Sequence, residues 1–179
     1  KGGLEGSSGS MLFDRCIAHD NVGSNNNGFA APGIFNHCIS DSNGSAGFRS
    51  LSNTTFDLVN CDAYNNGSDG IIGGQRRMHI ENCNLVKNGG WGINLTGNVN
   101  AGLIVNCAFG SGTQVNASGQ ISIPATNLVQ EIGTITYAAN VTPWVDPANG
   151  DFRINLGNAK GTGRGTFTET QGGYSGTVG

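Results

Sequence analysis

The chain has 179 residues, of which 31 are glycine and 23 are asparagine, while charged residues make up only 12% and the formal net charge is −3. Nine lysines and arginines, which gather nowhere beyond Arg76 and Arg77, exclude the basic surface of a nucleic-acid-binding protein. No run of about 18 apolar residues is present to insert into a membrane. The N-terminal sequence KGGLEGSSGS lacks the apolar core of a signal peptide, so a signal for export would lie outside this sequence.

Five cysteines recur along the chain at intervals of 22, 23, 22 and 24 residues. An apolar residue stands three positions before each cysteine, arginine, histidine or asparagine stands directly before it, and asparagine stands five positions after each of the first four. A fixed period of this length marks a repeat fold. The columns run through Cys16, Cys38, Cys61, Cys83 and Cys107, through Phe13, Phe35, Leu58, Ile80 and Ile104, and through Asn21, Asn43, Asn66 and Asn88.

Each repeat contains short alternating runs separated by glycine and asparagine, which predicts three short strands and three turns per repeat. Leucine-rich repeats would need more leucine, and helical repeats would need longer periods and less glycine. The pattern therefore predicts an all-β parallel β-helix in a single domain. Its coils of about 22 residues would stack at the inter-strand spacing of about 4.8 Å.

Stacked coils place equivalent residues above one another. The positions five and three before each cysteine, the cysteine itself and the position two after it are predicted to face the core. The residue directly before the cysteine falls at a bend, where asparagine and histidine suit a left-handed backbone conformation. The asparagines at this bend and those five positions after the cysteine are predicted to form two hydrogen-bonded ladders.

The cysteines are predicted to be free thiols. Parallel side chains on adjacent coils lie about 4.8 Å apart, which is too far for a disulfide. A linear column cannot supply the tetrahedral ligands of zinc, and the sequence has no C-x-x-C pair. We therefore expect them to act as small core residues that bind no metal.

The segments FDLVNCDAYNNGSDGI and HIENCNLVKNGGWGI, together with the repeats over roughly residues 10 to 110, resemble the right-handed parallel β-helix superfamily. That superfamily includes pectate-lyase-like secreted proteins and bacteriophage tailspikes. The resemblance implies a right-handed β-helix with coils in residues 1–110. Residues 111–179 would supply the last irregular coils and a C-terminal cap of the same domain, since WVDPANGDFRIN is similar to segments that close β-helices.

Two His/Asp pairs follow from aligning the repeats. His19 and Asp41 share the column three positions after the cysteine, and Asp57 and His79 share the column four positions before it. Both columns are predicted to face outward, with neighbours within hydrogen-bond reach. Either pair could serve as general acid and base. Polar pairs across exposed strands are also common as purely structural contacts.

Ligand-binding candidates lie where residues depart from their columns. Trp91 and Asp69 share a column at a strand entrance, where the indole could stack on a sugar ring or simply cover an apolar edge. Arg76, Arg77 and Lys87 could hold an acidic sugar, a role that the resemblance to pectate lyases implies. Those relatives pair such cations with calcium-binding carboxylates, but no tight carboxylate cluster is evident here.

We therefore expect no cofactor. Residues 62–70, DAYNNGSDG, offer oxygen ligands for calcium without the spacing of an EF-hand, so calcium is an alternative.

Three functions fit these features. The first is a β-helical shaft of an extracellular or virion adhesion protein, tailspike- or fibre-like, that binds surface polysaccharide and trimerises. The second is a secreted polysaccharide lyase or hydrolase, and the third is a purely structural virion decoration or extracellular filament subunit. Low charge, a polar surface and the lack of an evident acid/base cluster favour binding or structure over catalysis.

Overall fold

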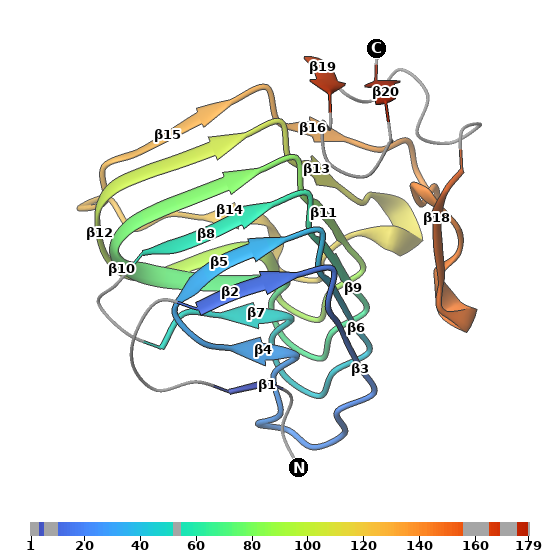
Figure 1. Cartoon of the computed structure of the whole chain (residues 1–179), viewed down its shortest axis with the longest axis horizontal. Helices are drawn as coiled ribbons and strands as arrows, with labels where there is room; N and C mark the ends of the chain where they lie inside the picture. Colours follow the sequence, from blue (N-terminus) through green and yellow to red (C-terminus); the bar gives the residue numbers. More distant parts are fainter. Residues whose placement is uncertain (1–3, 6–10, 52–54, 156–164, 169–174, 179) are drawn as a thin grey trace.

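The computed structural model describes residues 4–5, 11–51, 55–155, 165–168 and 175–178, and these residues form an all-β parallel β-helix (Figure 1). Successive coils lie on one another, and their strands pair in parallel with neighbours one repeat away in the sequence. The described part of the chain contains no helix long and apolar enough to cross a membrane. The predicted fold class is confirmed.

Three stacks of strands make up the sides of the β-helix. The β2–β15 stack holds β2 (Met11–Asp14), β5 (Gly33–Asn36), β8 (Phe56–Val59), the second halves of β10 (Ile71–Glu81) and β12 (Trp91–Val105), and β15 (Val129–Ile132). The β3–β16 stack holds β3 (Ile17–His19), β6 (Ile39–Asp41), β9 (Asp62–Tyr64), β11 (Asn84–Val86), β13 (Ala108–Phe109) and β16 (Ile135–Thr136). The β1–β14 stack holds β1 (Leu4–Glu5), β4 (Phe29–Ala30), β7 (Phe48–Arg49), the first halves of β10 and β12, and β14 (Gly119–Ser122).

The core fills the inside of the coils, as the repeat columns predict. Phe13 stacks on Phe35 with ring centroids 4.8 Å apart, and Phe29 stacks on Phe48 at 5.1 Å. The cysteines are free thiols; the first, in the first coil, is half-buried and the other four are buried. The remaining inward columns are buried among them, including Leu58, Ile80, Leu85, Ile104 and Phe109.

The bend before each cysteine has the predicted left-handed conformation. Arg15, His37, Asn60, Asn82 and Asn106 all have φ between 50 and 56°. The repeats contain a second left-handed bend, four positions after the cysteine, that the sequence did not reveal. Its residues have φ between 52 and 60°, but they are of four different types, namely Asp20, Ser42, Asn65 and Lys87.

The asparagine ladder five positions after the cysteine forms as predicted; Asn21 at its start is half-buried, and Asn43, Asn66 and Asn88 are buried. Asn66 Nδ2 donates to Asn88 Oδ1 (2.9 Å) and to the Ser40 carbonyl (3.0 Å). Its Oδ1 accepts from both the side chain (2.9 Å) and the backbone N–H (3.2 Å) of Asn43. The ladder also includes Asn116, 28 residues beyond Asn88. Asn116 Oδ1 accepts a hydrogen bond from the Asn88 amide at 2.9 Å.

The last coil ends the core with a charged residue. Glu131 on β15 is the register partner of Ile104 and so continues an inward column, yet it is exposed because none of the described residues forms a coil beyond it. Thr134 Oγ1 donates a hydrogen bond to its carboxylate. The column that is apolar in five coils is therefore polar in the last one.

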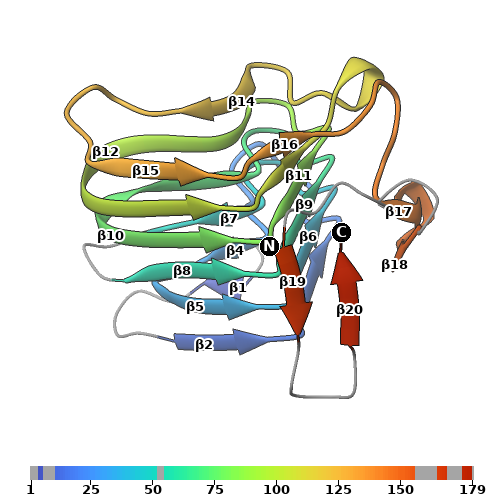
Figure 2. The same ribbon diagram turned by 90° about the horizontal axis from the view of Figure 1, so that it is seen from above.

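A C-terminal segment, residues 137–155, lies against the outer side of the β3–β16 stack (Figures 1 and 2). It contains the hairpin of β17 (Trp144–Asp146) and β18 (Asp151–Ile154), joined by the 3-10 helix η2 (Pro147–Asn149). Another 3-10 helix, η1 (Gly112–Gln114), follows β13, and β19 (Gly165–Thr168) pairs with β20 (Ser175–Val178) in antiparallel fashion.

This segment builds a second hydrophobic cluster outside the coils. Trp144 is fully buried, with its ring 5.5 Å from that of Tyr64 and 5.2 Å from that of Phe152. Val86 is buried in the same cluster. The column three positions after the cysteine points away from the core as predicted, but it is buried beyond His19, and the C-terminal segment covers it at Tyr64 and Val86.

The ladder should be a main source of stability. Asn66→Ala removes the hydrogen bonds to Asn43, Asn88 and Ser40 and leaves buried polar groups unpaired, so we expect the free energy of unfolding to fall by about 3 kcal/mol. Urea denaturation measures this loss. The control Asn149→Ala removes one exposed hydrogen bond, to Asp146, and should cost less than about 1 kcal/mol. Equal losses in the two variants would contradict the importance of the ladder.

The cysteine column should not tolerate a hydroxyl. Cys83 is buried among apolar side chains. We expect Cys83→Ser to lower the free energy of unfolding by roughly 1 to 3 kcal/mol, because it buries a more polar group. Cys16→Ser, at the half-buried end of the same column, should cost less in the same assay. A larger effect at Cys16 than at Cys83 would overturn this expectation.

Candidate functional site

The outer side of the β2–β15 stack carries a cluster of polar side chains at its centre, on β8 and β10. Asp57 and His79 are register partners on these adjacent strands and are both half-buried. Glu81 lies two residues beyond His79, on the same side of β10. Exposed Leu12 and Ile34 continue the column toward the N-terminal coils, and Leu103 continues it on the other side. We refer to Asp57, Arg77, His79 and Glu81 as the outer polar cluster.

The ion pair in this cluster is not the predicted one. His79 Nε2 lies 3.2 Å from Glu81 Oε2, along the strand rather than across to Asp57. Asp57 Oδ1 is buried and has no hydrogen-bond partner among the described residues. Burial raises the pKa of Asp57, while the positive charges of His79 and Arg77 oppose that rise. The cluster thus combines an unsatisfied carboxylate oxygen with an imidazole one strand away, which are groups able to accept and donate protons.

The second predicted pair lies elsewhere. His19 and Asp41 are register partners in the β3–β16 stack. His19 Nδ1 instead contacts Asp20 Oδ2 at 3.2 Å, and both side chains are exposed. Asp41 is only 8% exposed, and burial raises its pKa. The two pairs therefore belong to different sides of the β-helix and do not form one site.

Asp69 is held by hydrogen bonds from within the protein. It is buried, its Oδ1 accepts the Trp91 backbone N–H at 2.6 Å, and its Oδ2 accepts the Asn94 amide at 3.1 Å. The Trp91 ring packs over Gly119 of the next coil and is half-buried. The Asp69 carboxylate is therefore taken up by contacts within the protein, while the Trp91 side chain remains partly accessible.

The three predicted cations are spread over the molecule. Arg77 is the exposed member of the outer polar cluster, and its charge lowers the pKa of Asp57. Lys87 lies at a bend bordering the β3–β16 stack, with Nζ 5.8 Å from the centroid of the Tyr64 ring. The side chain of Arg76 lies outside the described part of the structure. Arg77 and Lys87 do not converge on a common ligand position.

The predicted calcium loop does not bring its carboxylates together. Asp62 accepts a hydrogen bond from the Asn84 amide at 2.8 Å, whereas Asp69 faces Trp91 and Asn94. Among the described residues, no group of three or more His, Cys, Asp and Glu side chains is placed to hold a metal ion.

Sequence reasoning missed Glu81 and the contact of Asp62 with Trp144. Glu81 could have been found from its spacing, because residues two apart on a strand share a side and His79 had been placed outward. The contact between Asp62 and Trp144 could not have been found from the sequence, since these residues are 82 positions apart and belong to no common column.

No family model matches this chain, and no curated protein sequence matches it. A solved structure with a similar fold is that of the periplasmic alginate epimerase AlgG, at 13% sequence identity and a TM-score of 0.49. The match covers 71% of this chain and 39% of that protein, so the chain spans well under half of its length. That likeness concerns the course of the backbone and brings no activity with it. The chain is a β-helix protein, as its resemblance to the right-handed parallel β-helix superfamily implies.

Proposed function

We propose that this chain is the β-helical shaft of an extracellular or virion adhesion protein, tailspike- or fibre-like, and that it binds surface polysaccharide on the outer side of the β2–β15 stack. The observation behind this choice is the difference between the two outer sides. The C-terminal segment covers the β3–β16 stack, whereas the β2–β15 stack presents the outer polar cluster with an unsatisfied carboxylate at its centre.

The composition of this side suits a sugar chain. Asp57 and Glu81 offer acceptors for hydroxyl groups, and Arg77 offers donors. Ile34 and Leu103 flank them in the same column and provide apolar surface for the C–H faces of sugar rings. Parallel strands repeat these positions about every 4.8 Å, so a polymer lying across the strands would meet apolar groups on either side of the polar ones.

The lyase or hydrolase remains a second candidate because of one observation. Asp57 combines a buried, unpartnered oxygen with a raised pKa and has His79 as its neighbour, which is an arrangement that can serve general acid/base catalysis. Both candidates use the same residues. The third candidate, a purely structural protein, would bind no sugar there.

Binding is tested on a glycan array, followed by calorimetry with the best ligand. We expect His79→Ala to weaken binding about tenfold, as loss of a hydrogen bond to a charged group does. His19→Ala is the matched control, because it removes another histidine paired with a carboxylate, but on the β3–β16 stack. Absence of glycan binding, or equal weakening by both variants, would overturn the proposal. Trp91→Ala tests whether the indole edge contributes.

Catalysis is tested separately by release of reducing ends or unsaturated sugars from a polysaccharide panel. If the outer polar cluster is catalytic, Asp57→Asn should lower turnover at least a hundredfold while retaining binding. The variant Asp41→Asn, on the other side, should leave turnover unchanged. No product from any polysaccharide would favour the adhesion shaft, for which light scattering should give the mass of a trimer.

A further inference from the structure

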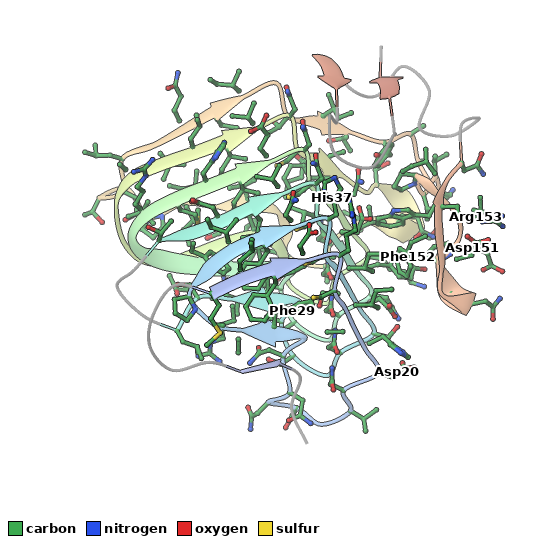
Figure 3. The ribbon with its side chains drawn as sticks, in the orientation of Figure 1. Asp20, Phe29, His37, Asp151, Phe152 and Arg153 are labelled. Atoms are coloured by element: carbon green, nitrogen blue, oxygen red, sulfur yellow. The ribbon has the colours of Figure 1, made fainter. Side chains whose placement is uncertain are left out.

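The C-terminal segment is attached to the β3–β16 stack by a polar chain as well as by apolar packing. Tyr137 Oη donates to Asn84 Oδ1 at 2.7 Å, and Asn84 Nδ2 donates to Asp62 Oδ1 at 2.8 Å. Asn84 therefore connects the segment to Asp62 on β9. In Figure 3, Phe152 points from the hairpin toward the stack, whereas Asp151 and Arg153 point away from it.

Asp62 is half-buried on β9, next to the Trp144 indole of the C-terminal segment. Burial raises its pKa to about 7, an effect strengthened by the Cys61 thiol and opposed by the Asn84 amide and the Trp144 indole. Trp144 Nε1 is itself buried without a hydrogen-bond partner among the described residues. The indole N–H therefore lowers the energetic cost of ionising Asp62 without forming a hydrogen bond to it. A carboxylate at this place is costly when ionised.

The other titratable groups around Asp62 do not offset its charge. Tyr64 is buried on the same strand, and burial together with Asp146 and Asp41 raises its pKa further. Asp41 and Asp146 are acidic, so neither can neutralise an ionised Asp62. Lys87 is the nearby cation that contacts this cluster, and it is exposed above the outer edge of the Tyr64 ring.

We propose that Asp62 is a proton switch for the C-terminal segment: neutral Asp62 lets residues 137–155 dock on the β3–β16 stack, and ionised Asp62 loosens them. Loosening would uncover the apolar strip of Tyr64, Val86 and Ala108. The proposal is independent of whether the opposite side of the β-helix binds polysaccharide.

The direction of the pH effect follows from linkage. The docked state keeps Asp62 protonated up to about pH 7, whereas an undocked, solvated Asp62 would hold its proton only up to about pH 4. Docking is therefore strongest below about pH 4. It weakens by up to about tenfold per pH unit as pH rises toward 7, and it changes little above that.

Hydrogen exchange of the Trp144 indole N–H, followed by NMR, reports the opening of the segment, because this group is buried beneath it. Rates are divided by those of an unstructured tryptophan peptide at each pH. We expect the protection factor to be about tenfold or more lower at pH 7 than at pH 5. Backbone amides of the ladder asparagines Asn43 and Asn66 serve as the internal reference for global unfolding and should not follow this change.

Two variants identify the responsible group. Asp62→Asn should give high protection of the Trp144 indole at every pH, whereas Asp41→Asn, another buried carboxyl of the same side, should retain the pH dependence. Asn84→Ala removes a group that lowers the Asp62 pKa, so it should extend the pH-dependent range upward. Constant protection in the unmodified protein, or an unaltered pH dependence in Asp62→Asn, would overturn the proposal.

Discussion

Hydrogen bonding between identical asparagines on successive coils is the interaction on which the rest of this structure depends. Each buried ladder amide uses donors and acceptors that face its neighbours above and below, as Asn66 does with Asn88, Asn43 and the Ser40 carbonyl. Such an amide is satisfied only if adjacent coils keep one register. The ladder therefore fixes the stacking, and the stacking in turn fixes which side chains face inward and which face outward.

The outer sides of the β3–β16 and β2–β15 stacks differ because this register decides which side chains each of them presents. The β3–β16 stack carries an apolar outer column, at Tyr64 and Val86, that requires a cover, and the C-terminal segment supplies it with Trp144. The β2–β15 stack carries mixed polar and apolar columns and holds the outer polar cluster. The C-terminal cover and the outer polar cluster thus lie on different sides, so a change in one need not disturb the other.

The inward columns, the bend before each cysteine and the asparagine ladder could be predicted, because each depends on contacts one repeat apart. Asn116 escaped prediction because an insertion places it 28 residues after Asn88. The pairing of His79 with Glu81 escaped because aligned columns reveal neighbours across strands and not along one. The cover over Tyr64 escaped because Trp144 stands outside the periodic part of the chain, where packing leaves no repeating signal.

Glu131 ends a hydrophobic column of the core at the last described coil. Parallel strands at the edge of a solenoid invite another copy to add its own coil, and such growth would produce fibres. An added coil would have to bury this carboxylate against its own apolar column, at a cost that no neighbouring cation offsets among the described contacts. One acidic residue in an otherwise hydrophobic column therefore disfavours the stacking of a further coil on this end of the β-helix.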